Sequence, residues 1–156
     1  MKIEVLARSK TRKLLLLNSA EYYAKKLNLK KSKYTVYIES FPGLAKNYGD
    51  NGNVCKVGRR RLLIRIDSKL SFTNVLNTLA HEMVHVKQFA RGQFKAEKAR
   101  NGKFRRFWMG KRVTANYFDR PWEVEAYQKQ DEMAIDLIHH LISNLKKKKI
   151  FDNKSK

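Results

Sequence analysis

The chain has 156 residues, 42% of them hydrophobic, and a formal net charge of +21. This length and composition predict one folded domain with a sizeable core and exclude a disordered chain. The sequence has no apolar stretch of membrane-spanning length, no signal-peptide pattern at its start, and a single cysteine, Cys55. These features exclude a transmembrane segment and an intrachain disulfide, and we expect a monomeric cytoplasmic protein with no membrane partner.

The first 67 residues predict a small sheet that contains one helix between its strands. Residues 2–7 have the pattern of a strand and residues 10–29 that of a helix. Four further segments follow in chain order: a strand over 34–38, a loop rich in Asn, Asp and Gly over 44–52, and strands over 54–57 and 61–67.

The next segment predicts a buried amphipathic helix. Ser71 is a residue type that caps helix amino termini, Gly92 is one that follows helix carboxyl termini, and the apolar residues between them follow a helical period. His81 and His85 lie four residues apart, hence on one face, and Glu82 follows the first of them. This spacing lets two imidazoles hold one zinc ion while the glutamate reaches a nearby water. The alternative is a pair of surface histidines, which the apolar surroundings disfavour.

Residues 93–118 are basic and irregular, with aromatic residues spaced between the charges, and their pattern allows a β-hairpin without requiring one. Pro121 suits the first turn of a long helix that we expect to end near Leu145. We expect residues 1–145 to form the domain and residues 146–156 to form a basic flexible tail.

A catalytic zinc ion usually takes three protein ligands and leaves a fourth position to water. His139 and His140 lie near the end of the last helix, and we interpret both as structural or surface residues. Glu123 and Glu125 lie two residues apart at the start of that helix, so they are on different faces. One can face the ion and the other solvent. The alternative is that both simply favour the positive helix terminus.

These two motifs together resemble the gluzincin branch of zinc metallopeptidases, in which a second helix bears a glutamate ligand. The segment Glu123-Val124-Glu125-Ala126 matches the Glu-x-x-Ala pattern of several such families, with Glu123 in the ligand position. Residues 60–135 are similar to small phage and bacterial SprT-like metallopeptidases. The resemblance implies a single-domain α+β zincin-like fold with a small mostly antiparallel sheet, an active-site helix and a long C-terminal helix. It also implies a bacterial or phage-infected host cytoplasm.

The resemblance further implies one Zn²⁺ per chain, bound by His81, His85 and Glu123, with Glu82 as the general base of peptide-bond hydrolysis. Tyr127 stands where many gluzincins carry Asp or Asn, so the hydrogen-bond partner of a zinc-binding histidine is unassigned. Three residues are candidates for stabilising the oxyanion, and the sequence leaves the choice among them open: Tyr117, Tyr127 and Arg120.

In zincin folds the strand before the motif helix often borders the cleft, so we expect residues 61–67 to pair with an extended protein or peptide substrate. The positive charge attracts polyanions, and it predicts contact with nucleic acid or with a nucleic-acid-associated substrate, unless the lysines only solvate the surface. Two alternatives to a peptidase stay open. One is a nucleic-acid-binding protein with a structural or vestigial zinc site, and the other is a zinc hydrolase of a non-peptide amide.

Overall fold

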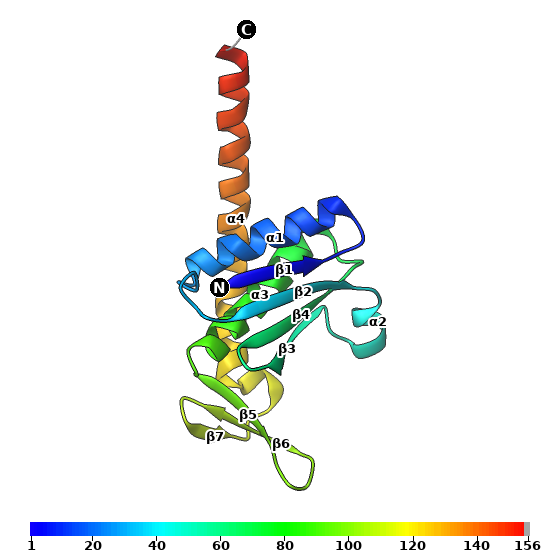
Figure 1. Cartoon of the computed structure of the whole chain (residues 1–156), viewed down its shortest axis with the longest axis vertical. Helices are drawn as coiled ribbons and strands as arrows, with labels where there is room; N and C mark the ends of the chain where they lie inside the picture. The colour runs from blue at the N-terminus through cyan, green and yellow to red at the C-terminus, as the bar shows by residue number, and fades with distance from the viewer. Residues whose placement is uncertain (155–156) are drawn as a thin grey trace.

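The computed structural model describes the backbone of residues 1–154 and the side chains through Lys146. It has a single α+β domain with two sheets and two long helices, α3 and α4 (Figure 1). The elements of the first half are β1 (Lys2–Leu6), α1 (Lys10–Lys26), β2 (Thr35–Phe41), α2 (Leu44–Tyr48), β3 (Gly52–Gly58) and β4 (Arg61–Asp67). Those of the second half are α3 (Phe72–Ala90), β5 (Phe94–Lys98), β6 (Phe104–Trp108), β7 (Lys111–Val113), the 3-10 turn η1 (Tyr117–Asp119) and α4 (Pro121–Lys154).

The larger sheet is mixed, with the strand order β1-β2-β4-β3. β1, β2 and β4 run parallel, and only β3 is antiparallel to its neighbour β4. The prediction of a mostly antiparallel sheet is therefore wrong for this sheet. The reason is α1, which connects β1 to β2: a helical crossover returns the chain to the same end of the sheet and makes its two strands parallel.

The position of β4 also corrects the expected substrate strand. β4 pairs with β2 on one side and β3 on the other, so the hydrogen-bonding groups of residues 61–67 are used within the sheet. β3 is the edge strand on this side of the sheet. A free edge for pairing with another chain is therefore offered by β3 and not by β4.

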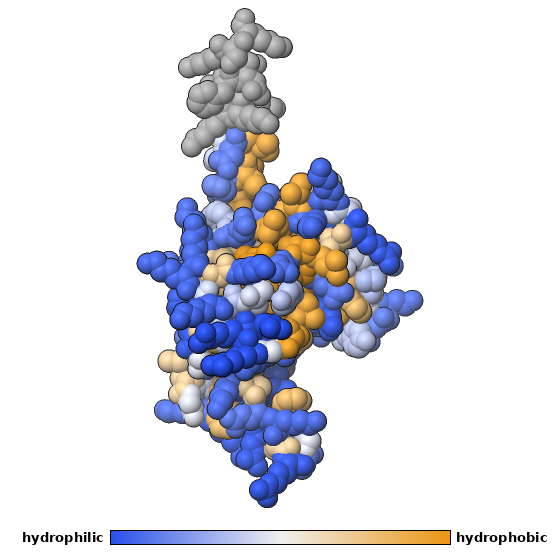
Figure 2. Space-filling view, in the orientation of Figure 1, coloured by the Kyte–Doolittle hydropathy of each residue, from blue (hydrophilic) through white to orange (hydrophobic). Residues whose placement is uncertain are grey.

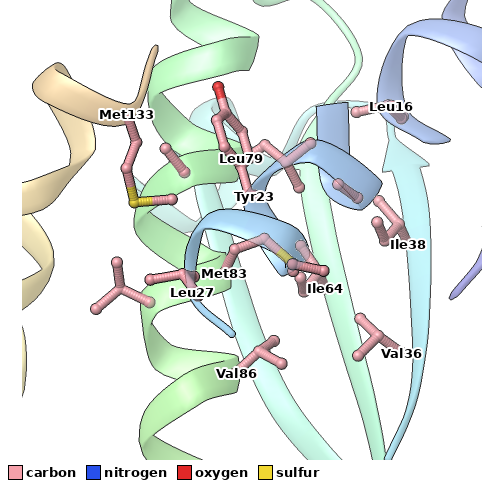
Figure 3. Packing of buried hydrophobic residues seen from close by; sticks show 14 of the residues in the cluster. Leu16, Tyr23, Leu27, Val36, Ile38, Ile64, Leu79, Met83, Val86 and Met133 are labelled. Atoms are coloured by element: carbon pink, nitrogen blue, oxygen red, sulfur yellow. The ribbon is translucent and has the colours of Figure 1, made fainter. Parts of the chain in front are cut away.

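The core lies between one face of this sheet and the helices. Alternate residues of β2 and β4 point inward, among them Val36, Ile38 and Ile64, as expected for strands with one buried face. They meet Leu79 and Met83 of α3 (Figure 3). α3 also packs against α1 and α4, so it is the central helix of the domain.

The smaller sheet is antiparallel, with the order β5-β6-β7, and it lies at the end of the molecule opposite to the projecting end of α4 (Figure 1). Aromatic contacts connect it to the domain: the Phe94 ring lies 5.1 Å from that of Phe89 and 4.7 Å from that of Trp122. Hydrophilic side chains, with a few apolar ones among them, cover the visible side of this end (Figure 2). Residues 93–118, for which the sequence allows a hairpin without requiring one, thus form a hairpin with a third strand.

Two segments extend beyond or differ from the sequence predictions. α2 occupies part of the expected loop over 44–52. α4 begins at Pro121 as predicted but continues to Lys154, well beyond the expected end near Leu145. The flexible tail predicted for 146–156 lies largely outside the described side chains, and it stays a prediction. No helix in the described part of the chain is both long and apolar enough to cross a membrane.

Candidate metal centre

Helix α3 forms where the sequence predicts it. The Ser71 side chain caps its amino terminus by accepting a hydrogen bond from the Asn74 backbone N–H, at 3.4 Å. At the other end, Gly92 has a φ of +67°, a conformation that glycine adopts at little cost. The second half of α3 is buried almost continuously, which fixes the face on which His81 and His85 lie.

His81, His85 and Glu123 converge at one point between α3 and the first turn of α4. All three are buried, with exposed fractions of 8%, 9% and 6%. The two Nε2 atoms lie 3.1 Å apart, and Glu123 Oε2 lies 3.3 Å from His81 Nε2 and 3.4 Å from His85 Nε2. Zinc–ligand bonds of about 2.0–2.1 Å in a tetrahedron place neighbouring ligand atoms about 3.3–3.4 Å apart. The three separations therefore fit one small cation.

The hydrogen bonds around the two imidazoles explain why a cation suits this point. His81 Nδ1 lies 2.9 Å from Gln130 Oε1, and His85 Nδ1 lies 2.8 Å from Gln88 Oε1. A glutamine Oε1 only accepts, so these contacts assign the ring hydrogens to Nδ1 and leave both Nε2 lone pairs facing Glu123. Glu123 Oε2 is buried and has no hydrogen-bond partner among the described residues. Three acceptors with no donor between them are costly unless a cation binds there.

The titration behaviour of the group leads to the same conclusion. Burial raises the pKa of Glu123, but the two imidazoles that face its carboxylate outweigh burial and hold that pKa well below its ordinary value. Burial lowers the pKa of His85, and its interactions with Glu123 and Glu82 outweigh this and raise the pKa overall. The site therefore favours a positive charge, which a proton or a metal ion can supply.

Glu82 is buried beside this group, on the turn of α3 that carries His81. Burial raises its pKa, although the nearby His85 and His81 oppose that effect. Glu82 lines both hollows that meet at the candidate metal site. A carboxylate that is buried, raised in pKa and open to a cleft has the properties of a general base.

The cleft consists of two hollows of about 440 Å³ and 250 Å³. They share a wall made by Asp50, Gly52, His81, Glu82 and Tyr117. The group that could hold a metal is therefore reached from both sides, and it lies near the middle of a continuous depression. A molecule longer than the site can cross it in an extended conformation.

Both histidine supports come from residues that sequence reasoning missed. Gln88 binds His85 and also donates through Nε2 to the Trp122 carbonyl, at 2.9 Å, and to Glu125 Oε2, at 3.0 Å. Glu125 is therefore neither part of the candidate metal site nor directed to open solvent, since it forms an ion pair with the buried Lys87. The signal in the sequence was the pair Lys87-Gln88, two polar residues on the buried part of a helix.

The two remaining histidines and the three oxyanion candidates lie at different distances from the candidate metal site. His139 and His140 are exposed, and His140 packs on the Tyr22 ring at 5.1 Å, apart from the candidate metal site formed by His81, His85 and Glu123. Tyr117 lines both hollows. The Tyr127 ring lies edge-on to His81 at 4.7 Å, and the Arg120 guanidinium lies 5.2 Å from the centre of the Tyr117 ring. Among the three oxyanion candidates, Tyr117 alone borders the cleft on both sides.

Comparison with known proteins adds no family assignment: the chain matches no protein-family model, no curated protein and no solved structure. What can be concluded about function depends on the residues of the site and their geometry.

Proposed function

We propose that this protein is a zinc-dependent metallopeptidase with a zincin-like fold and a gluzincin-type site. The observation that carries the proposal is the convergence of His81, His85 and Glu123 as three acceptors at tetrahedral spacing. Two histidines and one glutamate are the ligand set of catalytic zinc, whereas structural zinc sites are closed by four ligands, usually with cysteine. The only cysteine, Cys55, is exposed on β3 and is not part of the group.

The residues divide the chemistry among them. Zinc held by His81, His85 and Glu123 would supply a Lewis acid that activates water and polarises the scissile carbonyl. Glu82 takes the proton of the attacking water at its carboxylate and passes it to the leaving amine. Its raised pKa suits a group that must both accept and release a proton. The Tyr117 hydroxyl, at the boundary of the two hollows, donates to the oxyanion that forms at the carbonyl.

The substrate we propose is a protein or peptide in an extended conformation. β3 is the free edge next to the site, and its residues Gly52, Asn53 and Val54 line the cleft. Strand addition to this edge would satisfy the backbone groups of both chains and draw a peptide across the candidate metal site. This places the substrate strand on β3 and not on residues 61–67.

The test compares zinc content with hydrolysis in three variants. We expect Glu123→Ala to lose bound zinc and Glu82→Gln to keep it, while both lose hydrolysis of an unstructured protein such as casein. Glu97→Gln, an exposed acid on β5, is the matched control and should retain both. Elemental mass spectrometry gives the zinc per chain. Wild-type zinc content in Glu123→Ala, or wild-type hydrolysis by Glu82→Gln, would refute the assignment of roles.

A second candidate function is nucleic-acid contact at the tip of the β5–β6 hairpin. The tip carries Lys98, Arg100 and Lys103, and no acid occurs in the sequence from residue 98 to residue 118. Phe104 is 58% exposed beside these cations, which suits an aromatic ring that stacks on an unpaired base. Binding of a single-stranded oligonucleotide over a salt series tests it: Phe104→Ala and a triple Lys/Arg→Gln variant of the tip should both weaken binding. Equal binding by the triple variant and the wild type would exclude this contact.

A further inference from the structure

The two hollows on either side of the candidate metal site differ in chemistry. The one toward the small sheet has three aromatic walls, Phe89, Phe94 and Trp122, and two cations, Arg106 and Arg120. The other hollow also has aromatic residues, Tyr117, Phe118 and Tyr127, but no Lys or Arg lines it, and its remaining walls include the neutral polar residues Asn74, Asn77, Thr78 and Gln130. The cleft is therefore asymmetric, which means that the two sides of a bound peptide meet different surroundings.

Arg106 reaches the hollow because of its place on β6. It pairs in register with Ala96 and Val113, two small or apolar residues, and it is half-buried. Among the described residues it has no ion-pair partner, although Lys95 on the same sheet does. Arg105 is the preceding residue of β6, so its side chain points to the opposite face, and it is exposed.

Arg120 directly precedes α4 and lines the same hollow. Its Nε donates to the Ala115 carbonyl at 3.4 Å, and its guanidinium lies 5.2 Å from the centre of the Tyr117 ring and 6.0 Å from that of Trp122. These contacts hold the guanidinium in place without neutralising it. No carboxylate of the described chain forms an ion pair with it.

The acids of this hollow do not cancel the two cations. Glu123 belongs to the candidate metal site, and Glu82 is its proposed base. The remaining acid, Asp50, lies on the wall that both hollows share and forms no ion pair within the described chain. Neither Arg106 nor Arg120 thus has an ion-pair partner among the described residues, and the anion that peptides carry is a carboxylate.

We propose that this hollow binds a carboxylate of the substrate on the small-sheet side of the scissile bond. Arg106 and Arg120 bind the carboxylate, and the aromatic rings pack against the carbon atoms that bear it. The proposal rests on the proposed peptidase function, because it names the substrate class of the same cleft. The carboxylate has two sources, an Asp or Glu side chain or the free carboxyl terminus of the substrate.

Binding measurements test this without hydrolysis. The zinc-loaded Glu82→Gln variant is titrated against fluorescein-labelled peptides with amidated ends, in which a single Glu is moved through a neutral sequence. Each is paired with a Gln peptide at the same position, and one further peptide has only a free carboxyl terminus. We expect one Glu position, or the free terminus, to bind about tenfold more tightly than its neutral counterpart, as hydrogen bonds to a charged group predict.

Arginine variants in the same background show where the preference arises. Arg106→Gln and Arg120→Gln should each abolish most of it, and Arg106→Lys should restore part of it. Arg105→Gln, on the opposite face of the same strand, controls for the general positive field and should leave it unchanged. The proposal is overturned if no Glu position and no free terminus is preferred, if Arg105→Gln abolishes the preference equally, or if Arg106→Gln weakens an oligonucleotide and not the peptide.

The two proposals can fail separately. If an Arg106-dependent preference is found and the wild-type protein hydrolyses no peptide bond, the carboxylate site stands and the peptidase assignment falls. If the wild type hydrolyses peptides and the Glu and Gln series bind equally, the peptidase assignment stands and the carboxylate site is wrong.

Discussion

Gln88 links the candidate metal site to the start of α4, and its removal should weaken both the proposed metal binding and folding. The side chain is fully buried and makes three hydrogen bonds: to His85 Nδ1 at 2.8 Å, to the Trp122 carbonyl at 2.9 Å and to Glu125 Oε2 at 3.0 Å. Gln88→Ala removes all three hydrogen bonds, of which two are buried and one is half-buried. At about 1 kcal/mol for each neutral bond and about 2 kcal/mol for the bond to the carboxylate, the free energy of unfolding should fall by about 4 kcal/mol.

The same change should reduce zinc affinity about 10–100-fold, because the orientation of His85 and the position of its ring hydrogen are no longer fixed. Urea unfolding in the presence of chelator gives the stability term, and competition with a zinc indicator gives the affinity. Gln130→Ala is the control: this residue is only half-buried and supports His81, so zinc affinity should fall with a smaller loss of stability. Unchanged zinc affinity in Gln88→Ala would refute the role assigned to Gln88.

Three further predictions concern metal removal, backbone packing and acid stability. A ligand stabilises the state that binds it. A free zinc concentration of a hundred times Kd should therefore raise the free energy of unfolding by about 2.7 kcal/mol relative to the protein in chelator. Equal melting curves with zinc and with chelator would contradict a native metal site. Gly52→Ala should lower the free energy of unfolding by about 1–3 kcal/mol, since a Cβ there would lie 2.5 Å from Thr78 Cγ2 and 3.2 Å from Ile66 Cδ1. A Cβ at Gly58 would have its nearest contact at 3.5 Å, so Gly58→Ala should have the wild-type free energy of unfolding in urea titrations. Hydrogen bonds from the backbone N–H groups of Lys69 and Ala45 hold the pKa of Asp67 below its ordinary value, so its contribution to stability is present above about pH 4 and is lost as pH falls toward the lower folded pKa. Asp67→Asn should flatten the fall of stability with acid in that range, and a wild-type pH profile in this variant would show that Asp67 is not responsible.

The parts of the fold that sequence reasoning found are those determined by local periodicity. The strand over 61–67 has the predicted bounds, and α3 starts after Ser71 and ends just before Gly92, because a cap and a glycine mark its ends. The parallel pairing of β1 with β2 was missed, since strand direction depends on a crossover through α1 and not on the composition of either strand. α2 was missed because its five residues lie among turn-forming residues.

The site divides in the same way. His81 and His85 were found because a metal requires certain residue types at fixed spacing, Glu123 was found through the resemblance to gluzincins, and the structure brings the three together. Gln130, Gln88 and Lys87 follow no such rule: their roles depend on which face of α4 meets α3, which is a property of tertiary packing. In the sequence Arg106 is only one of many positive charges in a basic segment. Strand alternation in the small sheet places Arg106 on the face that lines the hollow and its neighbour Arg105 on the opposite face.

The residues of the candidate metal site come from two helices, and the whole small sheet lies between them in the chain. His85 is near the end of α3 and Glu123 is in the first turn of α4, so an ion bound to both ties together the two ends of the segment that contains β5, β6 and β7. Such a cross-link removes loop-closure entropy from the unfolded chain in the manner of a disulfide, in a protein with only one cysteine. Loading of the ion would then limit the motion of the small sheet relative to the domain and hold Arg106 over the cleft.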